Sequence, residues 1–359
     1  MTTAATDSPI ESTAVASVSD RADWDALVAS RGGQPFQASA WGELKSAFGW
    51  LPARLATHDR SAAAQLLIRP HRGMAVAYVP RGPVGFDTAL VEEMVRTARS
   101  RRAAFLRLEP NVLETDAEAG RLTADLQALG FKPSDRTLQP RSSIRLSLLP
   151  SADELFAGFS KGHRADIRRA ERDGVTVRAG STDTDPDVLH RMLAATRERK
   201  EFGFHSAAYW RRLMTAFGDA ARLQIAELEG EPIAASLVLA WGNHGVYLAA
   251  GSTRSGLDHR AAHLLQWHAI RWARERGAQT WDLWGIADAR GRHELALAGG
   301  SATPHQLAAL DAEARKDPLD GVYRFKKGWG GEVVRTVPSF DRVFIKPAYW
   351  FWQWRRGEA

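Results

Sequence analysis

Apolar and polar residues follow one another along the chain with two periods, that of a helix and that of a strand. In the first half they predict helices at 24–31 and 39–48, strands at 63–68 and 74–79, a helix at 88–101 and a strand at 104–109. In the second half they predict strands at 222–227, 233–241 and 245–250, a helix at 260–276 and a strand at 281–285. Strand, strand, loop, helix, strand therefore occurs twice, which indicates a duplicated domain.

The predicted helix at 260–276 has a clear apolar face. That face carries Ala262, Leu265, Ala269, Trp272 and Ala273, so the helix is expected to pack on a sheet. The repeated order of elements is similar to that of an acyl-CoA N-acyltransferase (GNAT) core, a mixed sheet flanked by helices. We therefore predict an α/β (α+β) fold with two tandem GNAT-like domains.

The segment between the two halves is predicted to be helical and carries a stripe of cations. Ser151 and Glu154 have the spacing of a capping box, which marks the start of a helix. Farther on, one helical face bears Lys161, Arg164, Arg168 and Arg172. Four cations on one face suit contact with the phosphates of tRNA, and a solvated surface accounts for them equally well.

The composition indicates the number of domains and the charge of a partner, and it excludes several kinds of chemistry. A chain of 359 residues exceeds what one compact core usually holds, so two domains are expected. The net charge of +6 and the pI near 9.8 favour an anionic partner such as tRNA, a nucleotide diphosphate or a membrane surface. The absence of cysteine excludes disulfides, thiolate catalysis and metal sites with sulfur ligands.

The N-terminal segment 1–20 is rich in Ala, Ser and Thr. It lacks the basic start and the apolar centre of a secretory signal, and no later stretch is long and apolar enough to cross a bilayer. We expect a disordered leader followed by a cytoplasmic protein.

Several motifs of cofactor and metal chemistry are missing. The sequence has no GxxxxGK[ST] loop, no GxGxxG after a strand, no GxSxG elbow and no HExxH, and we expect no metal site. Coenzyme A users cradle the pyrophosphate in a glycine-rich loop of backbone amides. Here the loop at 80–85 contains two prolines, which lack that donor, and the loop at 252–259 has one glycine. Coenzyme A is therefore not the expected donor, and no other cofactor is predicted.

Four stretches in a fixed order carry a resemblance to a known family. They lie at 36–45, at 78–83 with 106–110, at 282–286 and at 321–332. On these stretches, and over nearly its whole length after the leader, the chain resembles the Fem family. Members of that family are aminoacyl-tRNA-dependent transferases that build peptidoglycan interpeptide bridges.

The resemblance implies a domain organisation and a set of partners. The C-terminal segment returns to complete the first domain, which then comprises 21–148 and 334–359, and the second domain comprises 149–333. Larger members carry a coiled-coil arm, for which 164–199 leave no room, so the compact type is expected. The implied donor is aminoacyl-tRNA, with no cofactor, and the implied acceptor is UDP-MurNAc-pentapeptide or lipid II. A monomer is expected.

The resemblance also implies catalytic residues. Because the donor is an activated ester, the enzyme has to align an amine with the carbonyl and stabilise the oxyanion. Lys326, with Phe325 beside it, matches the family lysine near that carbonyl, or it holds the 3′ end of the tRNA. Glu109 takes the place of a family aspartate and can orient or deprotonate the amine. The alternatives are a surface lysine after a hydrophobic anchor and a strand-end carboxylate.

Two matched positions are expected to bind the acceptor. Lys45 matches a family lysine on the diphosphate, and Tyr247 matches an acceptor-binding tyrosine on a strand that is predicted to face the cleft. Arg81 is expected either to bind phosphate or to brace its loop. For each residue a structural role, such as core packing for Tyr247, is the alternative.

One further pair departs from the family pattern. Tyr209 is the tyrosine of an arginine–tyrosine pair that binds the same diphosphate, and His205 stands where the arginine is expected. A histidine is mostly neutral at pH 7, so the contact is predicted to be weaker and pH-sensitive. Arg197 or Arg199 can take the place of the missing cation.

Three readings compete with this function. The duplicated core favours a coenzyme A-dependent N-acyltransferase, a relative of the family can aminoacylate a small metabolite, and the stripe at 161–172 favours a non-catalytic RNA or anionic-surface binder. The aromatic segment at 349–356 is expected to pack in the core, with contact to a membrane surface as the alternative.

Overall fold

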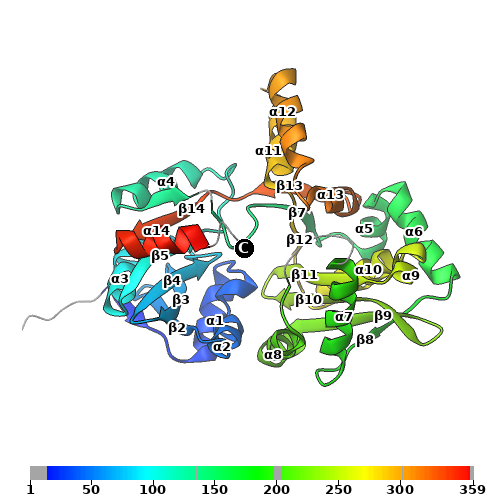
Figure 1. Ribbon diagram of the computed structural model, residues 1–359, viewed down its shortest axis with the longest axis horizontal. Coiled ribbons are helices and arrows are strands. Elements are labelled where there is room, and N and C mark those ends of the chain that lie inside the picture. The colour runs from blue at the N-terminus through cyan, green and yellow to red at the C-terminus, as the bar shows by residue number, and fades with distance from the viewer. Residues whose placement is uncertain (1–13, 135, 198–203, 301, 356–359) are drawn as a thin grey trace, which may run out of the picture.

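The computed structural model describes residues 14–134, 136–197, 204–300 and 302–355. It consists of two mixed seven-stranded sheets that lie side by side, each flanked by helices (Figure 1). The predicted α/β fold with two GNAT-like halves is confirmed.

The first sheet has the strand order β1-β2-β3-β4-β5-β14-β6. Its strands are β1 Val15–Ser17, β2 Leu51–Thr57, β3 Ala63–His71, β4 Met74–Pro80, β5 Ala103–Glu109, β6 Lys132–Ser134 and β14 Ser339–Val343. Among the described strands of this sheet only β4 and β5 pair in parallel, and the helix α3 (Thr88–Ser100) connects them. An apolar face on this helix packs Leu90, Val91 and Met94 into the core of the first domain.

The second sheet has the order β13-β7-β12-β11-β10-β9-β8. Its strands are β7 Ser142–Ser147, β8 Thr176–Ala179, β9 Ala221–Leu228, β10 Glu231–Trp241, β11 His244–Ser252, β12 Thr280–Gly285 and β13 Glu332–Arg335. Again one pair, β11 with β12, is parallel, and the helices α9 (Arg254–Asp258) and α10 (Ala261–Glu275) connect it. The duplication predicted from the sequence is therefore present in the strand order.

The chain passes between the two sheets twice, once from β6 to β7 and once from β13 to β14. Strand β14 lies between β5 and β6, so the C-terminal segment completes the interior of the first sheet. Strand β7 lies N-terminal to the predicted boundary after residue 148 but belongs to the second sheet. Strand pairing therefore favours a boundary near residue 141.

The remaining helices cover the sheets and line the space between them. They are α1 Arg21–Ser30, α2 Ser39–Ser46, α4 Ala119–Ala128, α5 Ala152–Gly158, α6 Lys161–Arg172, α7 Asp185–Arg197, α8 Ala207–Phe217, α11 Asp288–Gly299, α12 Pro304–Ala314, α13 Asp320–Lys327 and α14 Lys346–Arg355, with short 3₁₀ turns at Pro35–Gln37 and Gly218–Ala220. The capping box at the start of α5 is present with both of its hydrogen bonds. The segment 254–258, predicted as part of a loop, instead forms the short helix α9.

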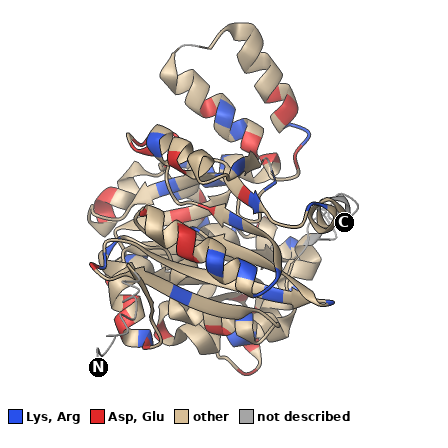
Figure 2. Cartoon of the chain, turned by 90° about the vertical axis from the view of Figure 1, so that its left-hand side faces the viewer, with Lys and Arg blue, Asp and Glu red and all other residues tan. Residues whose placement is uncertain are grey.

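Helices α11 and α12 form a hairpin that projects from the body of the molecule in both views (Figures 1 and 2). Its base is held by Arg290, which is bonded to Asp311 at 2.8 Å and to Asp320 at 2.8 Å. The sequence between Leu295 and Leu310 has no Lys, Arg, Asp or Glu. The pattern of the sequence did not predict this hairpin.

Candidate active site

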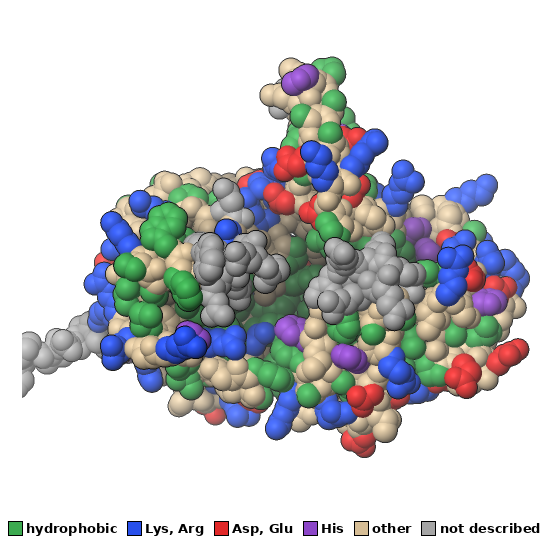
Figure 3. Space-filling view, viewed as in Figure 1, with side chains coloured by type: hydrophobic (Ala, Val, Ile, Leu, Met, Phe, Trp, Pro, Cys, Tyr) green, Lys and Arg blue, Asp and Glu red, His purple; other side chains and the backbone are tan. Residues whose placement is uncertain are grey.

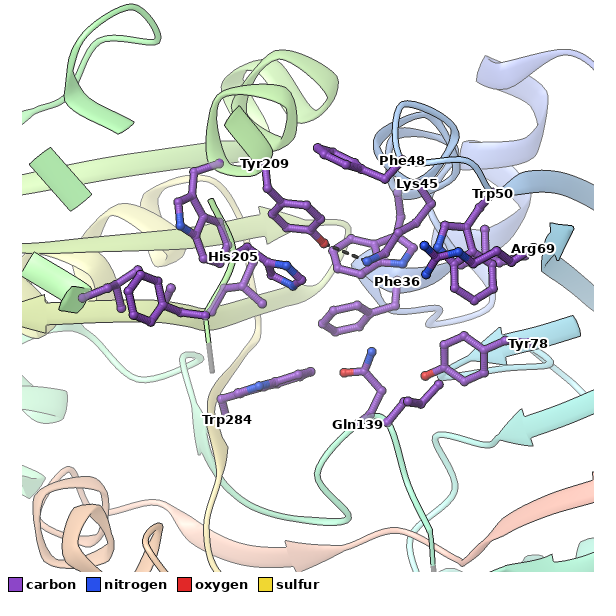
Figure 4. Close-up of a pocket in the computed structure, with 18 of the residues that line it drawn as sticks. Phe36, Lys45, Phe48, Trp50, Arg69, Tyr78, Gln139, His205, Tyr209 and Trp284 are labelled. Atoms are coloured by element: carbon purple, nitrogen blue, oxygen red, sulfur yellow. Dashed lines mark hydrogen bonds between the residues drawn. The ribbon is translucent and has the colours of Figure 1, made fainter. Parts of the chain in front are cut away.

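A cavity of about 750 Å³ lies between the two domains, where the face of the molecule in Figure 3 is hollowed. Helix α2 and strands β3 and β4 contribute one wall, and helix α8, strand β11 and Trp284 contribute the other (Figure 4). Its described lining is Phe36, Trp41, Lys45, Phe48, Trp50, Leu67, Arg69, Tyr78, Leu138, Gln139, Leu193, Phe204, His205, Tyr209, Trp210, Leu248, Ala249, Ala250, Trp284 and Leu319. These described residues include two cations, many aromatic rings and no carboxylate, so the cavity suits an anionic ligand with flat groups.

Lys45 joins the two domains across this cavity. Its Nζ donates a hydrogen bond to the Tyr209 hydroxyl at 2.8 Å and lies 4.7 Å from the ring centre of Trp41 (Figure 4). Burial, and then repulsion from Arg69, lowers the pKa of Lys45 to about 8. Two cations that repel each other in one cavity create a site in which a bound anion is stabilised.

His205 occupies the position at which the resemblance to the Fem family leads us to expect an arginine. Its ring stacks on Tyr209, with ring centres 3.7 Å apart and planes 17° apart. Burial, and then the charge of Lys45, lowers the pKa of His205 to about 4. His205 is therefore neutral near pH 7, as expected, and its weaker contact to the phosphates stays a prediction. Of its suggested substitutes, Arg199 and the side chain of Arg197 lie outside the described residues.

Trp284 forms part of the far wall in an unusual backbone conformation. Its φ is 65°, and the pairing of β12 with β7 is irregular between Asp282 and Gly285. The Asp282 carboxylate accepts a hydrogen bond from the Trp284 amide at 2.8 Å, which holds this conformation, and the indole stacks on Phe36 with ring centres 5.0 Å apart. A non-glycine residue with positive φ is costly, and such positions concentrate at functional sites.

Arg81 braces this wall from the first domain and does not line the cavity. It also has a positive φ, 49°, and its guanidinium lies 5.6 Å from the ring centre of Trp284. It donates a hydrogen bond to the Pro140 carbonyl at 2.7 Å, and burial lowers the pKa of its side chain. Of the two roles predicted for Arg81, these contacts favour bracing.

Glu109 is buried beneath the cavity and binds three donors of the first domain. It accepts hydrogen bonds from the Tyr78 hydroxyl at 2.5 Å and from the amides of Leu138 at 2.5 Å and Gln139 at 3.0 Å. Burial raises the pKa of the carboxyl group. With these bonds Glu109 fixes the segment after β6, two residues of which line the cavity.

Lys326 does not line the large cavity but is hydrogen-bonded to the residue that follows Trp284 of its lining. Its Nζ donates a hydrogen bond to the Gly285 carbonyl at 2.5 Å, and Gly285 directly follows Trp284. Burial lowers the pKa of Lys326 to about 8, although the nearby Asp282 carboxylate favours its charged form. An ammonium group has three donors, so two remain beyond the bond to Gly285.

Phe325 and Trp329, which lie on either side of Lys326 in the sequence, belong to one aromatic cluster. His163 of α6 and His263 of α10 complete it, with their ring centres 4.8 Å apart. The Phe325 carbonyl lies 2.7 Å from His163 Nε2, and a side chain at Gly328 would overlap the His163 ring. The glycine after Lys327 is thus required by close packing.

Tyr247 does not face the cavity. It packs against the second domain's core, on the side of the sheet that holds Trp281 and Trp329, whereas its neighbours Val246 and Leu248 lie on the cavity side. The strand lines the cavity, as predicted, through Leu248, Ala249 and Ala250. The Tyr247 side chain instead takes the alternative given for it, core packing, because successive residues of a strand point to opposite faces.

The predicted cation stripe lies on α6, which packs on α10 at the outer side of the second domain (Figure 1). Lys161, Arg168 and Arg172 are exposed, whereas His163, Ile167 and Ala170 are buried. Arg164 is half-buried and donates hydrogen bonds to the carbonyls of Ala157 and Phe159. The stripe is thus a surface of its own, separate from the large cavity.

A second cavity, of about 470 Å³, lies between α5 and the strands β7 and β13. Its lining includes Arg145, Gly158, Trp329, Gly330 and Gly331. Arg145 Nε lies 3.2 Å from Asp282, the carboxylate near Lys326. Lys326 is therefore close to both linings without being part of either: Gly285 follows Trp284 of the large cavity, and Asp282 pairs with Arg145 of the second.

Arg69, Trp50 and Trp284 line the large cavity and were not singled out from the sequence as site residues. The guanidinium of Arg69 lies 5.6 Å from the ring centre of Trp50. Within the described ranges, no cluster of three His, Cys, Asp or Glu side chains is placed to hold a metal ion, and no helix has the length and apolar character needed to span a bilayer.

Comparison with known proteins gives consistent relatives. A UDP-N-acetylmuramoylpentapeptide-lysine N(6)-alanyltransferase of Weissella viridescens is 28% identical over 277 residues, which are 71% of this chain and 80% of that protein. A lipid II:glycine glycyltransferase of Staphylococcus epidermidis is 23% identical over 90% of this chain and 92% of that protein.

The fold comparison agrees with the sequence comparison. The crystal structure of FemX superposes with a TM-score of 0.77 at 20% identity and covers 93% of this chain and 98% of that chain. The model of the FemAB family matches residues 28–231 and 227–355. The predicted resemblance is confirmed, and the chain belongs to the FemAB family.

Proposed function

We propose that this protein transfers an aminoacyl group from aminoacyl-tRNA to an amine on the stem peptide of a peptidoglycan precursor. The named relatives act on UDP-N-acetylmuramoylpentapeptide or on lipid II, and both of these acceptors carry a diphosphate. The observation that carries the proposal is the large cavity, in which Lys45 and Arg69 meet among aromatic rings without a carboxylate in the described lining.

The diphosphate of the acceptor binds between these two cations. A bound anion offsets the repulsion between Lys45 and Arg69, which adds to burial in lowering the pKa of Lys45. Tyr209 orients Lys45 through the 2.8 Å hydrogen bond. The neutral His205 fills the remaining space by stacking and carries no charge to the phosphates.

The ester of the donor reaches Lys326 from the second cavity. Helix α6, with its exposed cations, directly follows α5, three residues of which line that cavity, and these cations suit the phosphates of the tRNA. The glycines at 330 and 331 allow the backbone to approach the 3′ end closely. In this arrangement the tRNA and the acceptor reach Lys326 from different cavities.

The transfer needs no covalent intermediate on the protein. The neutral amine of the acceptor attacks the ester carbonyl, the carbon–oxygen bond to the tRNA breaks, and the terminal hydroxyl of the tRNA leaves with the proton of the amine. Negative charge develops on the carbonyl oxygen, and the Lys326 ammonium stabilises it with a donor that its bond to Gly285 leaves over. Phe325 supports Lys326 through the aromatic cluster.

A transfer assay tests the proposal. Purified protein is mixed with a panel of charged tRNAs and with UDP-MurNAc-pentapeptide or lipid II, and the acceptor is examined by mass spectrometry. We expect a mass increase of one or more aminoacyl residues with at least one tRNA. If no tRNA yields such a product with either acceptor, while the alanyltransferase of W. viridescens is active in the same mixture, the proposed function is wrong.

A further inference from the structure

A third cavity, of about 420 Å³, forms an apolar groove between α14 and the β3–β4 hairpin in the interior of the first sheet. We call it the α14 groove. Its lining is Arg69, His71, Arg72, Met74, Ala75, Val76, Ala104, Ala348, Phe351 and Trp352. The polar members all come from the end of β3 and its turn, so the rest of the groove is apolar.

Arg69 lines both the α14 groove and the large cavity between the domains. It stands near the end of β3, and its charge lowers the pKa of Lys45 on the cavity side. The groove therefore begins at the cation pair that the proposed function assigns to a diphosphate. No described residue that lines either cavity carries a carboxylate.

The wall of the groove is both exposed and firmly held. Met74 is 37% exposed and Phe351 is 54% exposed, which is unusual for large apolar side chains that meet at one site. Trp352 packs on Phe105 with ring centres 4.7 Å apart, and the Tyr349 hydroxyl donates a hydrogen bond to Asp341 at 2.8 Å. These contacts fix α14 on the sheet, so the groove is preformed. Figure 3 shows hydrophobic and cationic side chains together on this left-hand part of the face.

We propose that the α14 groove binds the first isoprenoid units of a lipid-linked acceptor whose diphosphate lies between Lys45 and Arg69. In a polyprenyl diphosphate the apolar chain begins at a phosphate oxygen, so its site has to start where the phosphate site ends. Arg69 provides this junction. A nucleotide-linked acceptor has a polar ribose at the same point and gains nothing from an apolar groove. The inference rests on the proposed function and names the acceptor class.

The test compares two acceptors that differ only beyond the diphosphate. One is UDP-MurNAc-pentapeptide, and the other is lipid II with a farnesyl chain, which dissolves without a bilayer. The variants Met74→Ser and Phe351→Ser remove apolar surface from the groove, and Trp350→Ser is the control, because Trp350 is 67% exposed on the same helix and does not line the groove. We expect the ratio of kcat/KM for the lipid-linked acceptor to that for the soluble acceptor to fall about tenfold in both groove variants, and to stay unchanged in the control.

If both groove variants are active on both acceptors and leave this ratio of kcat/KM unchanged, the α14 groove does not bind the isoprenoid chain. The proposed function is then unaffected. An equal loss in all three variants that occurs only when the acceptor is presented in vesicles also overturns the inference, because it indicates contact with the membrane surface. Wild-type protein that is inactive on both acceptors overturns the proposed function, and the inference with it.

A competition experiment needs no variant and is independent of folding. Farnesyl diphosphate and inorganic pyrophosphate are each titrated against transfer to the short-chain lipid II. The groove predicts that farnesyl diphosphate inhibits at a concentration about tenfold lower than pyrophosphate does. Equal potency of the two inhibitors contradicts the inference.

Discussion

Among the described residues, each domain contributes one lysine whose pKa is lowered by burial, and the two lysines have opposite surroundings. Lys45 of the first domain lines an open cavity, shares it with Arg69 and is bonded to a hydroxyl group. Lys326 of the second domain is enclosed, lies near the Asp282 carboxylate and is bonded to a backbone carbonyl. Burial lowers the pKa of each to about 8, so that value alone does not distinguish them.

The surroundings show what each cation still needs. At Lys45 the protein supplies a second positive charge, and the site is completed by an anion from outside, as substrate binding requires. At Lys326 the protein supplies the counter-charge, Asp282, and the ammonium group keeps two N–H donors that Gly285 does not use. These donors suit the stabilisation of a short-lived oxyanion. A lysine that binds ground states and a lysine that acts in the transition state should therefore respond differently to substitution.

The largest effect is expected at Lys326. Lys326→Met should lower kcat about 100- to 1000-fold, with KM for the acceptor little changed, because it removes an interaction made in the transition state. The control is Lys327→Met, since Lys327 is adjacent and exposed. Circular dichroism and thermal unfolding verify that both variants fold. Undiminished transfer by the Lys326 variant removes this lysine from the mechanism.

Substitutions at the cation pair of the large cavity should raise KM for the acceptor. Lys45→Met and Arg69→Gln each remove a charged contact to the diphosphate, worth about 1.5 to 3 kcal/mol, so KM for the acceptor should rise about 10- to 100-fold while kcat holds. Arg101→Gln, on the exposed turn before β5, serves as the control. If only kcat fell, Lys45 would act in the transition state, as proposed for Lys326, and would not bind the diphosphate.

The pH dependence separates the two lysines by a direct measurement of binding. Lys45 is cationic below its pKa of about 8 and neutral above it. Because an anion binds the cationic form, affinity for UDP should be constant near pH 7 and fall about tenfold between pH 7.5 and 9.5, as calorimetry measures it. The fall should disappear in Lys45→Met and persist in Lys326→Met. Its persistence in the Lys45 variant would contradict the assignment.

A smaller effect is expected at Glu109. Its three hydrogen bonds fix the segment that lines the cavity, so Glu109→Gln should lower the free energy of unfolding by about 1 to 3 kcal/mol and kcat by less than about tenfold. Denaturant unfolding and a transfer assay measure the two quantities. A fall in kcat of about 100-fold or more, in protein of unchanged stability, would instead make Glu109 the general base.

The smallest effect is expected at His205. Because its pKa is about 4, it is neutral between pH 5.5 and 7.5. His205→Gln should therefore change KM for the acceptor less than about threefold between pH 5.5 and 7.5. A KM that rises with pH in the wild type but not in the variant would show a cationic histidine on the phosphates.

Much of the fold could be predicted from the sequence, because its strands are continuous apolar runs and its long helices are amphipathic. The predicted strand at 233–241 is β10, and the predicted helix at 260–276 is α10. The hairpin of α11 and α12 was missed, because helices that project from the body bury little and carry no apolar stripe. Helix α9 was missed because it is one short turn around Gly256.

Site residues could be predicted from the sequence only where they lie in a motif that matches the family. Lys45 and Tyr209, far apart in the sequence, were both singled out and lie in contact, and their roles remain predictions. Arg69 was missed, because it reads as an ordinary strand-end cation until the fold brings it near Lys45. Strand β11 lines the cleft as predicted, but the Tyr247 side chain packs in the core. Because β11 is apolar on both sides, its pattern does not tell which of its side chains meet the cleft.

The position of β14 in the first sheet has a consequence for the order in which the protein is made. Strand β14 separates β5 from β6, and its Asp341 pairs with the buried Arg107 at 2.6 Å. Until the ribosome has synthesised residue 343, β5 is an open edge and the guanidinium of Arg107 has no carboxylate in this place. At roughly 5 to 20 residues per second, the intervening stretch of about 200 residues takes roughly 10 to 40 s. The N-terminal domain, first to leave the ribosome, therefore finishes folding only after the C-terminal domain has been translated.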